Sequence, residues 1–202
     1  MQALILAGVV GLWAAIHSWL ASIRMKDLAR RTLGEAGARA YRLFYNLFSV
    51  VSLIPIVLMW RGMPDRGLYN VGAPWSYLML GAQAASLVLL FLAFLQTGPL
   101  AFAGIAQLLG EKAGSGLTTT GFYGLVRHPL YLFGLLFLWL TPSMSVNQLA
   151  ISAVLTIYLF VGAILEERRL VKEFGGAYED YRSRTPMIIP FTRRGARLQD
   201  RR

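Results

Sequence analysis

An arginine and a histidine stand at the edge of an apolar segment, where charged side chains are uncommon. Arg127 and His128 directly precede Pro129 and the apolar run of residues 130–140. Proline suits the first turn of a helix, so the pair is expected at a helix N-terminus, where free backbone N–H groups and the helix dipole favour an anion. The pair is therefore a candidate binding site, in which His128 is also able to carry a proton.

A pair of glutamates follows the next long apolar run, residues 148–165. Glu166 and Glu167 would lie at the C-terminal end of a helix, where the helix dipole disfavours acidic groups. A cationic partner is therefore expected beside them. From these residues alone two partners remain open. One is Arg127 with the arginines that follow the glutamates, as structural ion pairs, and the other is a bound ligand with positive charge.

The elements that must hold these groups are helices of membrane-spanning length. Of the 202 residues, 56% are hydrophobic and 15% charged, a composition too apolar for an ordinary soluble domain. Four apolar runs are close to the roughly 20 residues that cross a bilayer core, and one run is shorter. The runs comprise residues 4–21, 43–60, 75–95, 130–140 and 148–165. We predict an all-α polytopic membrane protein with five transmembrane helices.

The last two spans are expected to form a C-terminal helical hairpin. The stretch TPSMSVN, residues 141–147, would turn the chain between them, because Pro142 ends the fourth span. The open end of this hairpin would then bring Arg127 and His128 close to the glutamate pair.

Basic residues predict the orientation of the spans. All but Arg61 and Arg66 of the 20 lysines and arginines fall in segments that five spans place on one side of the membrane. By the positive-inside rule the N-terminus is outside and the C-terminus cytoplasmic, as in a bacterial inner membrane. The net charge of +10 is explained by this topology and by attraction to anionic membrane lipids, so no nucleic-acid partner is expected.

The chain is predicted to form a single domain. Residues 1–96 would contribute the first three spans, residues 97–190 the half that carries the site, and residues 191–202 a basic tail. There is no cysteine, which excludes disulfides and a cysteine nucleophile. Because the only histidines are His17 and His128, no metal centre is expected.

Glycines and aromatic residues surround the two polar groups. Gly121 and Gly124 precede the first group and would allow a ligand to approach the backbone, and Phe174, Tyr178 and Tyr181 follow the second. A ligand with a carboxylate, an ammonium, a sulfonium and an aromatic base would use all of these features. S-adenosylmethionine is such a ligand.

Two motifs carry a resemblance to a known superfamily. GFYGLVRHPLY at residues 121–131 and LEERRLVKEFGGAYEDYRSRTPMIIP at residues 165–190 resemble the signature of the integral-membrane methyltransferases, which include isoprenylcysteine carboxyl methyltransferase and the phospholipid methyltransferases. The resemblance covers about residues 107–190. The stretches RHPLY, FLWLTPSMS, LEERRL, PMIIP and HSWLAS are most similar to the methanethiol S-methyltransferase branch.

This resemblance implies a cytoplasmic pocket for S-adenosylmethionine at the ends of spans four and five, with no separate metal. The residues implied in cofactor binding are Gln107, Gly121, Tyr123, Arg127, His128, Tyr131, Glu166, Glu167 and Tyr178. His128, Glu166 and Glu167 are the candidate catalytic residues, and which of them acts as a base stays open. Prenylcysteine enzymes have an arginine four residues before the glutamate pair, where this chain has Gly162, which argues against a prenylcysteine carboxylate as substrate.

Polar residues in the first two spans are candidates for contact with the methyl acceptor. Arg42, Asn46 and Ser49 recur at helical spacing and form a polar stripe on the second span. His17 lies in the first span and could face the same space. Hydrogen bonding between helices explains Asn46 and Ser49 equally well, and packing is the simpler explanation for His17.

Two further segments are expected near the pocket. Residues 98–110 are predicted to form a short interfacial or re-entrant helix that carries Gln107. Leu170, Phe174 and Tyr178 recur every four residues, which predicts one helical stripe that contacts the membrane or covers the cofactor as a lid.

The expected function is methyl transfer from S-adenosylmethionine to a small thiol or a lipid-soluble acceptor. Within this class, N-methylation of a phospholipid headgroup or carboxyl methylation of a prenylcysteine remains an alternative. From other classes, an NADPH-dependent enzyme like the sterol reductases and a non-catalytic membrane protein stay open. The sequence does not fix the oligomeric state.

Overall fold

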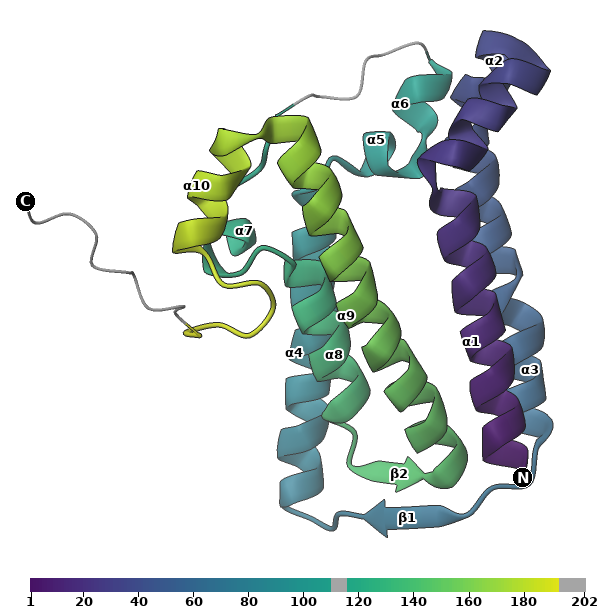
Figure 1. Ribbon diagram of the computed structural model, residues 1–202. Coiled ribbons are helices and arrows are strands. Elements are labelled where there is room, and N and C mark those ends of the chain that lie inside the picture. Colours follow the sequence, from purple (N-terminus) through teal and green to yellow (C-terminus); the bar gives the residue numbers. More distant parts are fainter. Residues whose placement is uncertain (110–115, 193–202) are drawn as a thin grey trace, which may run out of the picture.

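Long apolar helices make up most of the chain in the computed structural model, which describes residues 1–109 and 116–192 (Figure 1). Four helical stretches are long and apolar enough to cross a membrane: Gln2–Ala21, Ile23–Gly62, Trp75–Leu95 and Val146–Phe174. Helix α8, Pro129–Trp139, is apolar but shorter. Leucines on the outer faces are exposed, for example Leu12 and Leu78, as lipid-facing residues are. These helices support an integral membrane protein, and the count of five spans stays a prediction.

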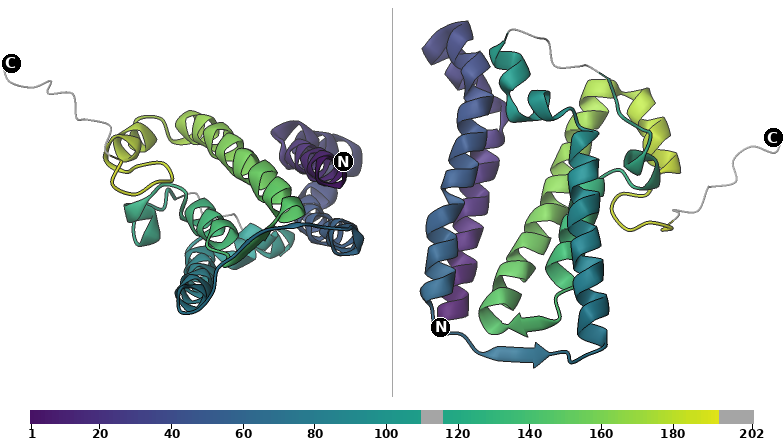
Figure 2. Two further views of the ribbon diagram at one scale, coloured as in Figure 1. Left: turned by 90° about the horizontal axis from the view of Figure 1, so that it is seen from below. Right: turned by 180° about the vertical axis from the view of Figure 1, so that it is seen from behind.

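The helices form two groups that meet along α1 and α9 (Figure 2). The first group contains α1 (Gln2–Ala21), α2 (Ile23–Val51) and α3 (Leu53–Gly62). The second contains α4 (Trp75–Leu95), α8 (Pro129–Trp139) and α9 (Val146–Phe174), with α4 packed on α8. Leu6, Val10 and Ala14 are buried at a spacing of four residues, so one face of α1 packs into the bundle.

Helix α2 is a hairpin of two helical arms. Gly34 interrupts it with φ 68° and ψ −168°, values outside the helical region, so the arms are residues 23–33 and 35–51. Ser22 begins the first arm, and its hydroxyl accepts a hydrogen bond from the Met25 N–H at 3.4 Å. The basic segment of residues 24–42 therefore forms a helical projection.

A short two-stranded sheet, which the all-α prediction did not include, joins the two groups at the end where the chain begins (Figure 1). Strand β1, Gly67–Asn70, pairs antiparallel with β2, Ser143–Ser145, so that Tyr69 lies opposite Met144. The predicted turn between the last two spans thus contains a strand. Asp65, just before β1, accepts hydrogen bonds from the backbone N–H of Arg66 at 2.8 Å and of Asn147 at 3.1 Å.

Two short helices pack against α2 at the other end of the bundle. Helix α5, Pro99–Ala103, and helix α6, Ile105–Leu108, replace the single helix predicted over residues 98–110. Gly104 separates them with φ 92°, and a Cβ there would lie 2.7 Å from the backbone nitrogen of Leu43. Glycine at this position therefore permits the close approach of this segment to α2.

The chain reverses after α9. Gly175, with φ 53°, ends α9, and helix α10, Gly176–Arg184, runs back beside α7, Phe122–Leu125 (Figure 1). The prediction of one helical stripe through Leu170, Phe174 and Tyr178 is therefore wrong, because Tyr178 belongs to a separate helix. The reversal brings residues 185–187 alongside the start of α8.

Asp65 is predicted to stabilise the joint between β1 and α9 in a pH-dependent way. Desolvation favours a higher pKa for Asp65, but hydrogen bonds from Ser145 and from the N–H groups of Asn147 and Arg66 outweigh it and hold the pKa below its usual value. The stabilisation is thus present above the unfolded pKa and is lost as the pH falls through the folded pKa. Asp65→Ala should lower the unfolding midpoint in detergent at pH 7 by about 2–4 °C.

Thermal unfolding of both proteins at a series of pH values checks this prediction. The difference between wild type and variant should narrow in acid. A difference that stays constant down to about pH 2, below the usual carboxyl range, would show that the charge of Asp65 contributes nothing.

Candidate functional site

The start of α8 and the last part of α9 meet at a buried ion pair. Arg127 precedes α8, and its Nε and Nη2 atoms both lie 2.6 Å from Oε1 of Glu167 on α9. The Arg127 and Glu167 side chains are only 8% and 9% exposed. The structure therefore brings together the two polar groups that flank the hairpin. Of the two partners that the sequence left open for the glutamates, it shows the first for Glu167, which forms an ion pair with Arg127.

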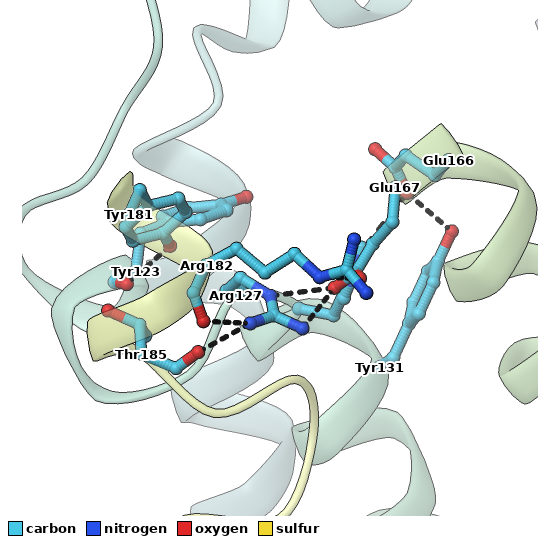
Figure 3. A network of polar contacts seen from close by, with 9 residues as sticks. Tyr123, Arg127, Tyr131, Glu166, Glu167, Tyr181, Arg182 and Thr185 are labelled. Carbon is cyan, nitrogen blue, oxygen red and sulfur yellow. Dashed lines mark hydrogen bonds and ion pairs between the residues drawn. The ribbon is translucent and has the colours of Figure 1, made fainter. Parts of the chain in front are cut away.

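The C-terminal segment closes around Arg127 (Figure 3). Its Nη1 atom donates to the carbonyl of Arg182 at 2.8 Å and to that of Thr185 at 2.6 Å. The Arg182 side chain in turn lies 3.6 Å from Oε2 of Glu167. One guanidinium thus joins the segment before α8 to α9 and to the end of α10.

Backbone hydrogen bonds complete this closure and correct one expectation. The N–H of Arg127 donates to the Pro186 carbonyl at 2.9 Å, and the N–H of His128 donates to the Met187 carbonyl at 3.0 Å. These two groups were expected to be free for an anion, but the C-terminal segment already uses them. Any anion site here depends on side chains rather than on these two N–H groups.

His128 and Tyr131 form a stacked pair beside the glutamates. Their ring centroids are 5.2 Å apart with an interplanar angle of 7°. The Tyr131 hydroxyl donates to Oε2 of Glu166 at 3.1 Å, and His128 Nδ1 lies 3.6 Å from the same oxygen. The Glu166 side chain is 48% exposed, so it remains accessible. Glu166, His128 and Tyr131 thus form a polar and aromatic wall next to the ion pair.

Two buried polar atoms in this region have no hydrogen-bond partner among the described residues. They are Nε2 of His128 and the hydroxyl of Tyr178, whose side chain is 0% exposed. Nε2 lies 3.4 Å from Oε1 of Glu167, but without hydrogen-bond geometry. An unpaired buried polar atom costs about 1–3 kcal/mol, so each of these atoms lacks a hydrogen bond that the described residues do not supply.

The environment keeps the nearby tyrosines protonated. Burial, followed by the negative charge of Glu167, raises the pKa of Tyr178 to about 12. Burial, followed by the charge of Glu166, likewise raises the pKa of Tyr123 to about 12. Both hydroxyls can therefore donate hydrogen bonds at neutral pH.

Gly121 faces a side chain that the sequence did not single out. Its φ is 62°, and a Cβ there would lie 2.7 Å from Nε2 of Gln96, whose Oε1 accepts from the Phe122 N–H at 3.2 Å. The Cβ side of Gly121 therefore faces Gln96 at the end of α4, and contact of the Gly121 backbone with a cofactor stays a prediction. A lone amide at the end of an apolar run gave no pattern that could have revealed this contact.

The remaining predicted site residues fall in different places. Tyr123 lies in α7, where its carbonyl accepts from the Tyr181 hydroxyl at 2.6 Å. Gln107 belongs to α6, and its side chain lies outside the described part of the structure. Among the described residues no group of three or more His, Asp or Glu side chains is arranged so that it could hold a metal ion.

Arg42 and Asn46, proposed to contact the acceptor, make hydrogen bonds to the backbone of α5. Arg42 Nη1 donates to the Ala101 carbonyl at 2.8 Å, and Asn46 Nδ2 donates to the Phe102 and Ala103 carbonyls at 2.9 and 3.0 Å. These hydrogen bonds agree with the alternative that such polar side chains connect neighbouring helices, here α2 and α5. Contact with an acceptor stays a prediction.

His17, the third candidate for acceptor contact, lies in an aromatic cluster between α1, α2 and α9. Its Nε2 lies 2.6 Å from the Tyr45 hydroxyl, and its ring stacks on Trp13 with centroids 5.0 Å apart. The Tyr158 ring on α9 approaches it edge-on at 6.1 Å. Gly162 follows Tyr158 by one turn, and a Cβ on Gly162 would lie 3.7 Å from the Tyr131 hydroxyl. One face of α9 thus connects this cluster to Tyr131.

A family model described as NnrU protein matches residues 4–192. The chain belongs to the NnrU family. The four helical stretches that are long and apolar enough to cross a membrane support an integral membrane protein.

Similar proteins carry the name of one enzyme. This NnrU-family chain is 31% identical over 191 residues to methanethiol S-methyltransferase 1 of Bradyrhizobium diazoefficiens, covering 92% of this chain and 66% of that protein, slightly less than two thirds. It is 33% identical over 195 residues to methanethiol S-methyltransferase of Crocosphaera subtropica, covering 93% of this chain and 74% of that protein. The resemblance expected from the sequence motifs is thereby confirmed. No solved structure matches the chain.

Removal of the Arg127 side chain should destabilise the NnrU-family fold strongly. Arg127→Gln leaves Glu167 buried without its main partner, which costs about 3 kcal/mol in unfolding free energy. Arg184→Gln is the matched control, because Arg184 pairs at 3.6 Å with Asp180 while both side chains are more than three quarters exposed, at 77% and 80%. The control should lose less than about 0.5 kcal/mol.

Denaturant titration of both variants in detergent micelles measures these losses. Equal unfolding free energies for Arg127→Gln and Arg184→Gln would contradict a structural role for the buried pair.

Proposed function

We propose that the chain is an integral-membrane methyltransferase that uses S-adenosylmethionine and methylates a small thiol. The observation that carries the proposal is the convergence of His128, Tyr131 and Glu166 beside two buried, unpaired polar atoms at one end of the α8–α9 hairpin. The names of its relatives support the same chemistry. A polar cluster at a membrane-embedded helix end is otherwise costly, which favours a functional explanation.

The side chains that remain available fit the chemical groups of S-adenosylmethionine. The exposed carboxylate of Glu166 suits its ammonium or sulfonium charge, and the unpaired atoms of His128 and Tyr178 suit its polar groups. The aromatic faces of His128 and Tyr131 suit a sulfonium or an adenine ring. Arg127 and Glu167 already satisfy each other, so we assign them to positioning rather than to direct contact.

When bound, S-adenosylmethionine supplies an electrophilic methyl group on a sulfonium. The task of the protein is then to align the acceptor and exclude water, because the positive charge is dispersed during transfer. A thiol acceptor reacts faster as the thiolate, so a nearby base would take its proton. His128 Nε2, which has no hydrogen-bond partner among the described residues, and the half-exposed Glu166 carboxylate are the candidates for this base, whereas Glu167 is held by Arg127.

We place the acceptor along the face of α9 that carries Tyr158, Gly162 and Glu166. The His17 cluster contacts this face at Tyr158, and Tyr131 contacts it at Gly162. Gly162 supplies no charged side chain to this face, so nothing at this position would bind the carboxylate of a prenylcysteine or the phosphate of a phospholipid. An aromatic environment also suits a polarisable sulfur atom. These features favour a small acceptor over a prenylated or phospholipid one.

Calorimetric titration of the detergent-purified protein tests the proposed cofactor. The protein should bind S-adenosylmethionine and its demethylated product and should ignore NADPH, and it should transfer a radiolabelled methyl group to methanethiol. Binding of NADPH alone would favour a reductase. Cofactor binding without transfer to any thiol, amine or lipid would favour the non-catalytic alternative.

The same titration on the variant Tyr178→Phe tests whether the Tyr178 hydroxyl contacts the cofactor. This change removes only a buried hydroxyl that has no partner, so it should weaken cofactor binding about tenfold while the unfolding midpoint stays the same or rises. Tyr181→Phe is the control, because that hydroxyl bonds to the Tyr123 carbonyl and its loss should lower the midpoint. Unchanged cofactor affinity in Tyr178→Phe would remove Tyr178 from the site.

His17→Phe tests the proposed acceptor path. The variant keeps an aromatic ring against Trp13 but loses the nitrogen that contacts Tyr45. We expect the KM for the thiol to rise about tenfold, as for loss of one polar contact, while the Kd for S-adenosylmethionine stays within about twofold. Steady-state kinetics with calorimetry separate the two quantities. A change in the Kd with no change in the KM would contradict this placement.

A further inference from the structure

We propose that the two arms of α2 form a binding site for the phosphate of an anionic membrane lipid. This inference is independent of the proposed methyl transfer. A cavity of about 200 Å³ lies between the arms, lined by Lys26, Asp27 and Arg30 from the first arm and by Ala38, Tyr41 and Arg42 from the second. Three cationic side chains thus face one carboxylate.

The positive charge of this cavity is only partly neutralised within the described chain, where Arg30 pairs with Glu35 at 3.4 Å. Among residues 1–109 and 116–192, no carboxylate lies within ion-pair distance of Lys26 or Arg42. Both side chains are partly buried. Arg169 on α9, which pairs with Glu173 at 3.7 Å, adds a further positive charge that acts on both. Like charges held together in this way favour an anion between them.

The position of the cavity indicates a lipid as the source of that anion. The Tyr41 hydroxyl donates to the Leu20 carbonyl at 2.8 Å, so one wall of the cavity rests on the last turn of the apolar helix α1. Lys26 lies five residues beyond Ala21, the last residue of the apolar helix α1, and so lies close to the end of a membrane-spanning segment, where lipid headgroups are expected.

The surroundings of the cavity also suit a membrane surface. Trp19 is 60% exposed one turn before the cavity, and tryptophan prefers the membrane interface. Ile23 and Leu28 are exposed on the same arm as Lys26 and Arg30, as in helices that contact headgroups and acyl chains together. Basic pockets between helices at this depth bind the phosphates of anionic lipids.

A binding assay with short-chain soluble lipids tests the proposal on the full-length protein in neutral detergent. Dihexanoyl-phosphatidylglycerol should bind at least tenfold more tightly than dihexanoyl-phosphatidylcholine, measured by thermophoresis. The double variant Lys26→Gln/Arg30→Gln should bind phosphatidylglycerol about thirtyfold more weakly, from two lost charges. The matched control Arg31→Gln/Arg39→Gln removes the same charge, one residue from each arm, but not from the cavity lining, and it should change affinity less than about threefold.

Each alternative outcome is distinct. Equal losses in both double variants would show that net charge and not the cavity binds the lipid, and would overturn the proposal. Inorganic phosphate that competes as well as phosphatidylglycerol would make this a site for free anions and would overturn the assignment to a lipid. If the double variant shows no unfolding transition, the single variant Lys26→Gln replaces it, with an expected loss of about fivefold.

Discussion

The buried ion pair between Arg127 and Glu167 is the interaction on which the arrangement of the C-terminal half depends. Two charges taken out of water lose hydration that is worth several kcal/mol each. The attraction within a buried pair offsets this loss only if the two groups are close and make further hydrogen bonds. Here the Arg127 guanidinium makes two short contacts to Glu167 and donates hydrogen bonds to the carbonyls of Arg182 and Thr185, and these interactions offset the lost hydration. The pair therefore exists only while α9, α10 and the segment before α8 are all in place.

This ion pair also explains how the short helix α8 can hold the side chains of the candidate site in fixed positions. Helix α8 has 11 residues and cannot cross a bilayer core of about 30 Å by itself. Arg127 and the backbone bonds of Arg127 and His128 to residues 186 and 187 fix its first turn. His128 and Tyr131 then have one orientation relative to Glu166. Rigid support of this kind is what precise alignment of two reactants requires.

Helix α9 connects the separate parts of the molecule. Its first half packs on α1, its middle carries Tyr158 against the His17 cluster, and its last turns hold both glutamates. The proposed cofactor and acceptor therefore share one rigid element. The N-terminal group α1–α3 contributes the aromatic cluster, while its basic arms carry the cavity in which we propose a lipid phosphate to bind.

The sequence predicted the features that follow from the types of the side chains, and it missed the features that are formed by backbone hydrogen bonds. The apolar run of residues 75–95 matches α4, and Pro129 marked the start of α8. Strands β1 and β2 have 4 and 3 residues, too few for an alternating pattern. The carbonyls that hold Arg127 gave no signal, because any residue supplies a carbonyl. The partners of Arg42 and Asn46 were missed for the same reason. Gly175 and Gly176 did signal a helix end, which the predicted stripe through Leu170, Phe174 and Tyr178 overlooked.

The most direct test of this account is a double-mutant cycle at Arg127 and Glu167 with the affinity for S-adenosylmethionine as the readout. Neither side chain is assigned to the cofactor, so each should act only through the other. The account predicts that Arg127→Gln, Glu167→Gln and the double variant all lose similar affinity, with a coupling energy above about 1 kcal/mol. Losses that add to within about 0.5 kcal/mol, or an unchanged affinity in all three variants, would contradict it.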